Sequence, residues 1–420
     1  MTPTTRSFIS VSKEADMQNN NEIKRHDASF AAGMMSFGGV ITVMMITIMI
    51  LIFGVWFLIA PKKEFSENEN RQLALAPVYT FQALKDGSYM TSIQKYLSDH
   101  FPIRDEFMTL KTKTEILTGK EEINDIYIAE DGYLIEAYDA PKQNEKIISQ
   151  FGKLCQNITT DAKNNISLML VPTAVTVYND KLPAASPDKG NLRQLATMDA
   201  IYEALPEIKR IDCYQGLSAQ AQSEKDADDV TPLYYHTDHH WTTFGAYIAY
   251  RQYCEAMGIT PLEESAFKKT VVTNSFRGTV YSKLNDTTVP GEEITIYENP
   301  ENRLTVNYQD SGEVTDSLYN KDYLSKKDKY SMFLNNLHPL IEITNETADS
   351  DKVMVLVKDS YANSIVPFLV NHYKKIYVFD TRYYRFGPAS FINQHPEVTD
   401  VLILYNMNTV DTDLGIGGIF

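Results

Sequence analysis

Residues 353–362 read Val-Met-Val-Leu-Val-Lys-Asp-Ser-Tyr-Ala and combine a strongly apolar run with a candidate reactive residue. The apolar run predicts a strand buried on both faces, as in a parallel sheet covered by helices. Ser360 would then stand on the turn from this strand into a helix. Open parallel sheets place their sites at this edge, so Ser360 is a candidate nucleophile. The local pattern alone favours a different role for Ser360, that of a helix N-cap.

Similar short apolar runs alternate with helical patterns on both sides of this stretch. We expect helices at 145–161, 192–205, 243–257 and 363–372, and strands at 167–171, 210–214, 353–357, 375–379 and 400–404. This alternation predicts an α/β fold with a mostly parallel sheet and helices on both of its faces.

Two regions depart from the alternation. Asp131-Gly132 lies between alternating apolar residues and predicts a β-hairpin. Residues 262–350 are rich in Thr, Asn, Asp and Glu, and we interpret them as an insertion or cap that shapes a substrate groove.

Composition excludes several classes of protein. The 420 residues are 43% hydrophobic and 22% charged, which is typical of a globular protein. The net charge of −16 argues against nucleic-acid binding. The three cysteines form no Cys-x-x-Cys pair, so neither a zinc ribbon nor a redox dithiol is indicated. We expect no cofactor.

One segment is long and apolar enough to cross a membrane. Residues 28–61 contain no Asp, Glu, Lys, Arg or His, and residues 40–60 read VITVMMITIMILIFGVWFLIA. A signal peptide or a buried helix is the alternative, but the stretch is too long for a signal-peptide core. We expect a cytoplasmic tail at 1–33, a single transmembrane anchor at 34–60, a helical neck at 61–125 and an extracytoplasmic catalytic domain at 126–420.

A second cluster of reactive side chains lies at 236–241, which read His-Thr-Asp-His-His-Trp. Asp238 and His240 are two residues apart, so in an extended or turn segment their side chains point the same way. The carboxylate could then fix the imidazole tautomer and leave Nε2 free as a base.

Two other interpretations of the histidine cluster stay open. The histidines could satisfy backbone groups at a helix start. They could also bind a metal, but the metallo-β-lactamase-type pattern would require a histidine at 234, where Tyr234 stands, and the remaining histidines are scattered singly. We therefore expect no metal.

The stretch 237–246 reads TDHHWTTFGA, and its Asp-His-His-Trp run is the motif that names the DHHW protein family. That family resembles the alginate O-acetylation proteins, whose domain is SGNH-hydrolase-like. Shorter motifs at 65–71, 99–105, 127–133, 170–173, 380–384 and 405–406 fit the same pattern, so the resemblance spans about residues 64–408. The resemblance implies a three-layer SGNH-hydrolase-like fold. It also implies Ser360 as nucleophile, His240 as base and Asp238 as the residue that orients the histidine.

The resemblance also implies a function. We expect a membrane-anchored O-acetyltransferase, with its catalytic domain outside the cytoplasmic membrane, that acetylates a cell-surface or secreted polysaccharide. A multi-pass membrane acyltransferase would supply the acetyl groups. The alternatives are a carbohydrate acetyl-esterase with the same triad and a non-catalytic glycan-binding subunit of an export complex.

Four further side chains are candidates for substrate contact. Arg382 and Tyr383 follow a predicted strand at the same sheet edge, where they could hold an acyl group and stack on a sugar. Tyr361 and Trp241 are sequence neighbours of the triad residues. For the oxyanion we expect the Ser360 N–H and the backbone N–H groups that follow it to be donors, and the loop at 172–173 is a further candidate.

Overall fold

The computed structural model describes residues 37–139, 144–223 and 230–420. They form two compact units, one of residues 37–65 with 72–104 and the other of residues 66–71 with 105–420. The predicted tail at 1–33 and the first residues of the predicted anchor lie outside the described residues. The predicted domain boundaries remain predictions.

The first unit contains a long apolar helix, Phe37–Ile59, and two shorter helices, α2 (Phe81–Lys85) and α3 (Ser88–Asp99). Within the described residues, Phe37–Ile59 is the one helix long and apolar enough to cross a membrane. Its 23 residues extend about 35 Å, against about 30 Å for a bilayer core. Thr80 caps α2 by accepting from the Ala83 N–H, and Gly87, at φ +80°, lets the chain turn into α3.

A mixed sheet forms the centre of the second unit, and in the described part of the chain it has eight strands. In spatial order the strands are β11 (Glu313–Thr315), β10 (Leu304–Tyr308), β12 (Leu340–Asn345), β14 (Lys375–Phe379), β13 (Val353–Lys358), β15 (Asp400–Asn406), β6 (Ile166–Val171) and β7 (Lys209–Arg210). The pairings from β14 to β7 are parallel and those from β11 to β14 are antiparallel. Leu356 of β13 lies opposite Val378 of β14 and Leu402 of β15.

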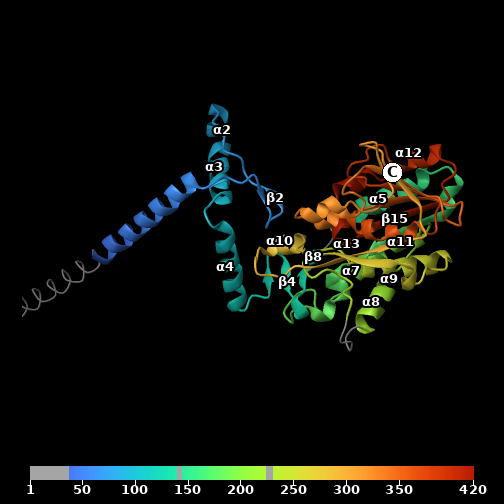
Figure 1. Cartoon of the computed structure of the whole chain (residues 1–420), viewed down its shortest axis with the longest axis horizontal. Helices are drawn as coiled ribbons and strands as arrows, with labels where there is room; N and C mark the ends of the chain where they lie inside the picture. Colours follow the sequence, from blue (N-terminus) through green and yellow to red (C-terminus); the bar gives the residue numbers. More distant parts are fainter. Residues whose placement is uncertain (1–36, 140–143, 224–229) are drawn as a thin grey trace, which may run out of the picture. The chain divides into compact units, whose positions relative to one another are not determined.

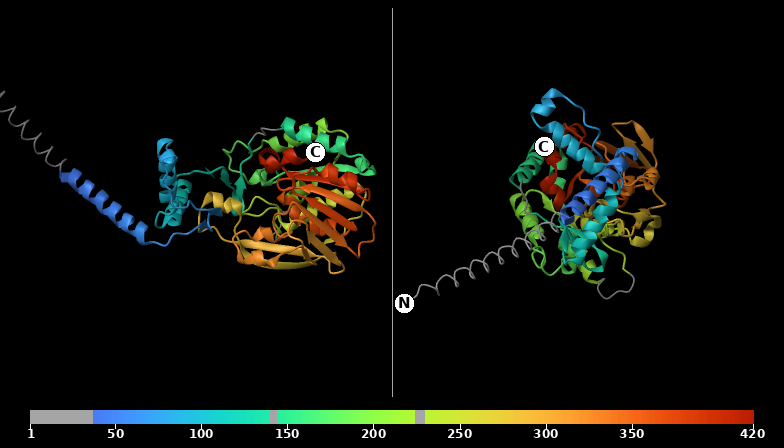
Figure 2. Two further views of the ribbon diagram at one scale, coloured as in Figure 1. Left: turned by 90° about the horizontal axis from the view of Figure 1, so that it is seen from above. Right: turned by 90° about the vertical axis from the view of Figure 1, so that its left-hand side faces the viewer.

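Helices flank this sheet on both faces. The helices of the second unit are α4 (Arg104–Leu117, whose first residue belongs to the first unit), α5 (Asn144–Asn157), α6 (Ala174–Val177), α7 (Arg193–Ala204), α8 (Tyr214–Ser223), α9 (Thr243–Met257), α10 (Thr279–Leu284), α11 (Val366–Leu369), α12 (Pro388–Gln394) and α13 (Met407–Thr412). Figure 1 shows α5 and α12 on one side of β15, and α9 and α11 on the other. Figure 2 gives two further views of the same layers. The predicted mixed α/β fold with a large, mostly parallel sheet is therefore confirmed.

Short strands lie outside the main sheet. β1 (Phe65–Ser66) pairs with β2 (Arg71–Gln72), and β3 (Glu122–Ile123), β4 (Ile126–Ile128) and β5 (Leu134–Glu136) form a small antiparallel sheet. The predicted hairpin is β4–β5, with Asp131 and Gly132 at positive φ in its turn. β8 (Lys268–Phe276) and β9 (Glu292–Glu298) form another antiparallel pair.

The central strands agree with the sequence pattern, and two flanking elements differ from it. All residues of β13 and β15 are buried, as expected for strands covered on both faces. The predicted strand 210–214 is reduced to β7, because Tyr214 already begins α8. The predicted helix 363–372 is a short 3₁₀ turn, η8 (Ser360–Ser364), followed by the single-turn α11 with Pro367 in its first turn.

The polar segment 262–350 is integrated into the domain. It supplies β10, β11 and β12 to the main sheet, next to β14. Alternate residues of β12 are buried and half-exposed, because one face of this strand is only partly covered. Its sequence therefore lacks the continuous apolar run of the parallel strands.

Candidate active site

The serine turn begins where β13 ends. Asp359, which is fully buried, is the N-cap of η8, so the cap role that the local sequence favoured for Ser360 belongs to its neighbour. The Asp359 carboxylate accepts from the Tyr361 N–H at 2.9 Å and from the side-chain amide of Asn406 at 2.6 Å. Asn406 ends β15, so these bonds fix the serine turn to the neighbouring strand.

The histidine loop meets this turn from a distant part of the sequence. Tyr234 and Trp241 form an isolated antiparallel bridge, and the Tyr235 N–H donates to the His240 carbonyl at 3.2 Å. This closed loop directs His240 toward Ser360, with 2.8 Å between Nε2 and Oγ. The other ring nitrogen, Nδ1, lies 2.5 Å from Oδ1 of Asp238. The structure thus brings together the three predicted triad residues.

Burial and neighbouring groups together set the charge states of this pair. Burial lowers the pKa of His240 to about 4, and nearby His239 acts in the same direction against the opposing effect of Asp238. Burial alone would raise the pKa of Asp238, but His239, His240 and the hydrogen bond from Thr279 together hold it well below its usual range. At neutral pH the site therefore holds a neutral imidazole beside an ionised carboxylate, which is the state that a general base requires.

Tyr330 supports the histidine from the polar segment. It belongs to the 3₁₀ turn η7 (Lys329–Met332), and its ring stacks on His240 with centroids 3.8 Å apart and planes 12° apart. Its hydroxyl donates to the Ser360 carbonyl at 3.1 Å. Sequence reasoning missed Tyr330, because a single tyrosine in a segment without regular pattern gives no signal.

The polar segment also orients the aspartate. The Thr279 N–H and hydroxyl donate to Oδ2 of Asp238 at 2.8 and 3.1 Å. Gly278 packs so closely against Asp238 that a Cβ at this position would collide with the carboxylate. Glu292, on β9, accepts from the backbone N–H groups of His236 and Thr237 at 2.7 and 2.8 Å. These contacts hold the loop that carries Asp238 and His240, and no local sequence pattern pointed to them.

A buried ion cluster carries Arg382. Asp380, which directly follows β14, accepts from Nε of Arg382 at 2.8 Å and from Nη2 at 2.5 Å. Lys358 is also buried, with Nζ 3.6 Å from Asp380. Burial opposes the charge of the guanidinium, but its two bonds to Asp380 outweigh that effect and raise the pKa of Arg382. The cluster therefore presents a fixed cation at the sheet edge.

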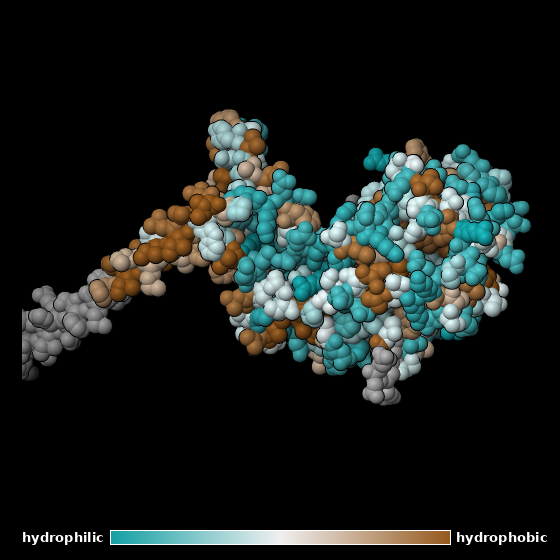
Figure 3. All heavy atoms as spheres, viewed as in Figure 1, coloured by the Kyte–Doolittle hydropathy of each residue, from teal (hydrophilic) through white to brown (hydrophobic). Residues whose placement is uncertain are grey.

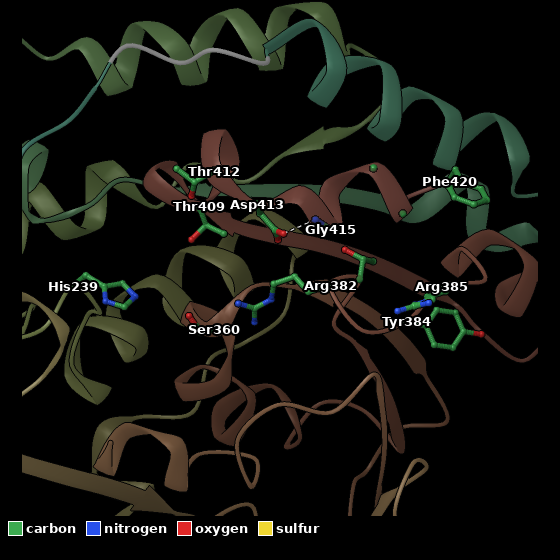
Figure 4. Close-up of a pocket in the computed structure, with 13 residues that line it drawn as sticks. His239, Ser360, Arg382, Tyr384, Arg385, Thr409, Thr412, Asp413, Gly415 and Phe420 are labelled. Atoms are coloured by element: carbon green, nitrogen blue, oxygen red, sulfur yellow. Dashed lines mark hydrogen bonds between the residues drawn. The ribbon is translucent and has the colours of Figure 1, made fainter. Parts of the chain in front are cut away.

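An open cleft lies over these residues. Its volume is about 830 Å³, and Ser360, His239 and Arg382 line it together with residues of the C-terminal segment 409–420. In Figure 4 the Arg382 guanidinium points toward Ser360. A second cleft of about 430 Å³ shares His239, Thr409 and Thr412 with the first. The candidate nucleophile is thus open to a ligand.

The other predicted substrate contacts differ in their placement. Tyr361 and Trp241 are fully buried and line neither cleft, which corrects their expected role. The Tyr361 hydroxyl donates to the His239 carbonyl, and the Trp241 indole donates to the Tyr361 carbonyl at 2.9 Å. Both side chains therefore hold the backbone around the site in place and do not face the clefts. Tyr383 is exposed but does not line the first cleft, whereas its neighbour Tyr384 does.

The expected oxyanion donors are mostly engaged elsewhere. The Tyr361 N–H donates to the Asp359 side chain and the Ala362 N–H to the Asp359 carbonyl. The Thr173 N–H donates to Gln194 at 2.9 Å, so the loop at 172–173 is not available. No protein acceptor among the described residues takes the Ser360 N–H, which leaves this group as a candidate donor.

Asp238, His239 and His240 have the ligand chemistry of a metal site, and their donor atoms lie within 4.8 Å of one another. These atoms already have partners, however. Nε2 of His240 faces Ser360, Nδ1 of His239 lies 2.5 Å from the Thr279 hydroxyl, and Oδ2 of Asp238 accepts from Thr279. The arrangement therefore fits proton transfer better than metal binding.

Fold and site together define an α/β protein with a linked serine, histidine and aspartate at the carboxyl edge of its parallel strands. The family model described as DHHW protein matches residues 110–379, so the chain belongs to the DHHW protein family. The name-giving Asp-His-His-Trp run is 238–241.

Solved structures of the same fold agree with this family. A DHHW family protein from Eubacterium siraeum is 23% identical with a TM-score of 0.60, over 70% of this chain and 95% of that one. PatB1 of Bacillus cereus, solved with a sulfonyl adduct, is 19% identical with a TM-score of 0.56, over 70% and 98% of the two chains. At these identities the likeness shows the fold. No curated protein matches the chain.

Proposed function

We propose that this protein is a membrane-anchored O-acetyltransferase of SGNH-hydrolase-like fold that acetylates hydroxyl groups of a polysaccharide outside the cytoplasmic membrane. The hydrogen-bonded series Ser360–His240–Asp238, at 2.8 and 2.5 Å, carries the proposal. These distances are those of a nucleophile, its base and the group that orients the base. The placement of Ser360 in an open cleft supports the same roles.

The proposed reaction has two steps that use the same base. In the first, His240 takes the Ser360 proton while Oγ bonds to the acetyl carbonyl carbon. The proton then passes from His240 to the leaving group of the donor, and an acetyl-serine forms. In the second, His240 takes the proton of a sugar hydroxyl, whose oxygen attacks the acetyl group. Ser360 leaves and regains its proton.

Arg382 and the Ser360 N–H are the proposed stabilisers of the oxyanion that develops in both steps. Arg382 lines the cleft with Ser360, and its guanidinium is fixed by Asp380. A preorganised cation needs little rearrangement as negative charge develops on the carbonyl oxygen. Tyr383, exposed next to Arg382, is proposed to contact the sugar.

The apolar helix Phe37–Ile59 supports the proposed membrane anchoring. The proposed extracytoplasmic side rests on the family resemblance. A multi-pass membrane acyltransferase is the proposed source of acetyl groups. The high share of acidic residues favours an acceptor other than a strongly anionic glycan.

The test uses the full chain in detergent with an activated aryl acetate. Intact mass is measured for the wild type and for Ser360→Ala, with and without oligosaccharide acceptors. We expect a trapped acetyl adduct on the wild type only, and faster clearance by sugar than by water. Faster clearance by water would identify an esterase instead. If no adduct forms and no acetate is released, catalysis through Ser360 is refuted. The hypothesis of a non-catalytic glycan-binding subunit then replaces that of an enzyme.

A further inference from the structure

We propose that helices α2 and α3 lie in the lipid–water interface beside the apolar helix, with one face in contact with the outer half of the bilayer. The proposal rests on the membrane anchoring proposed above and is independent of the chemistry at Ser360. All of the residues involved belong to the first compact unit.

One side of α3 carries an exposed apolar stripe. Met90 and Leu97 lie within α3 and are 59% and 47% exposed, and Phe101, just beyond the helix end, is 41% exposed. Spacings of seven and four residues place them on the same helical face. An apolar face of this kind is unfavourable in water and is typical of helices that lie on a membrane.

The opposite side of α3 is occupied by the chain itself. Asp99 is buried there and accepts from the Ala74 N–H at 2.8 Å. Nε2 of His100 lies 2.8 Å from the Ala74 carbonyl oxygen. These polar contacts fix the segment around Ala74 to α3, so the apolar stripe faces away from the packed side of the helix.

The stripe continues directly onto the apolar helix. The Phe101 ring stacks on Phe53 with centroids 5.1 Å apart, and Tyr96 meets Phe57 edge to face at 5.9 Å. Phe53 lies six residues before Ile59, which is about 9 Å along the helix axis. If the apolar helix spans the bilayer, Phe101 therefore lies beside acyl chains.

Neighbouring residues extend this apolar surface. Leu75, Val78 and Phe81 each have about three quarters of their surface exposed, and they lead into α2. Figure 3 shows hydrophobic residues along the apolar helix and again on the segment of α2 and α3. Nζ of Lys62 lies 3.5 Å from the centre of the Phe57 ring, which suits a lysine at the headgroup level.

The test measures how close single residues come to lipid. The full chain is placed in nanodiscs whose lipids carry a doxyl quencher, and a fluorophore is attached at Leu97→Cys, Ser92→Cys or Val43→Cys. The three native cysteines are buried, so labelling is directed to the new thiol. Ser92 is the matched control, because it is exposed on α3 but lies away from the stripe. We expect at least about twofold stronger lipid quenching at 97 than at 92.

Each outcome decides the proposal. Without quenching at Val43, in the first half of the apolar helix, the anchoring fails and the interfacial proposal with it. Quenching at Val43 but equal weak quenching at 97 and 92, with 97 open to aqueous iodide, overturns the interfacial helices alone. Protection of 97 from both quenchers would show that a protein surface covers the stripe, which also overturns the proposal. None of these results depends on acetyl transfer.

Discussion

The parallel and antiparallel parts of the second unit contribute different groups to the site. Ser360 follows the parallel strand β13 and Arg382 follows the parallel strand β14, and both residues line the cleft. The segment that contains the antiparallel strands supplies Tyr330 and Thr279, which contact His240 and Asp238 instead. Ser360 and Arg382 thus stand at the edge of the parallel strands, while Tyr330 and Thr279, which align the histidine and the aspartate, come from the more polar segment.

This difference indicates how the energetic contributions are divided. Removal of a reacting group should abolish a chemical step. Removal of an aligning group should leave that step possible but slower, because the reacting groups are no longer held in the right positions. Substitutions in the two regions should therefore fall into two classes of effect.

The largest effect is expected for Ser360→Ala, because the Ser360 hydroxyl is the group bonded to Nε2 of His240, at 2.8 Å, in the described part of the chain. We expect a loss in kcat of at least about 10³-fold for transfer from an aryl acetate. Ser223→Ala, at the exposed end of α8, is the control and should keep wild-type kcat. Full activity of Ser360→Ala would show that Ser360, at the edge of the parallel strands, is not the nucleophile.

Gly278→Ala should have the next largest effect, since its methyl group would collide with the Asp238 carboxylate. Displacement of Asp238 leaves His240 without a fixed orientation, and we expect kcat to fall about 100-fold. Gly152→Ala in α5, where the nearest atom is 3.8 Å from the new Cβ, is the control. Equal kcat values for the two variants would show that the polar segment does not align the aspartate.

Tyr330→Leu removes both the ring that stacks on His240 and the hydroxyl that bonds to the Ser360 carbonyl. Stacking and a hydrogen bond of this kind each contribute about 1 kcal/mol, so we expect kcat to fall about tenfold or somewhat more. Tyr330→Phe keeps the ring and should lose less. If the leucine and phenylalanine variants have the same kcat, stacking makes no contribution.

The smallest effect is expected when the pH is varied near neutrality without any substitution. His240 must be neutral to accept a proton, and its pKa of about 4 keeps it so down to about pH 5. We expect kcat/KM to stay flat from pH 7 to 5 and to halve at about pH 4. An acid limb near pH 6.5 would mean that the histidine is solvated.

A folding control accompanies the pH profile. The unfolded chain binds a proton at His240 with the ordinary pKa of 6.5, and the folded chain only at about 4. Stability is therefore lost as pH falls between these values. Circular dichroism at each pH separates unfolding from titration of the base.

Much of the parallel half was predictable because local sequence determines it. Strands covered on both faces show as unbroken apolar runs, and the predicted strand 375–379 coincides with β14. Ser360 stands shortly after such a run, and the Asp238–His240 pair stands shortly before the predicted helix 243–257, which coincides with α9. The antiparallel half gave no such signal, because half-exposed strands mix polar and apolar residues.

Sequence adjacency was a poor guide to substrate contact. Trp241 follows His240, and Tyr361 follows Ser360, but in a loop successive side chains point to different sides. Both aromatic rings turned inward, where burial of a large apolar surface is favourable. Tyr330 and Thr279 reach the site only through the tertiary fold, so no local pattern identified them.

The position of β15 has a consequence for when the site forms. This strand, near the C-terminus of the sequence, lies between β13 and β6, and its last residue, Asn406, ties down the turn that carries the serine. During synthesis from the N-terminus, every triad residue therefore emerges before the strand that joins the two sides of the sheet. We infer that the nascent chain stays inert until β15 inserts, and a truncation series labelled with a serine-reactive probe would test this timing. The late position of β15 in the sequence would thus keep the growing chain from reacting before the sheet is complete.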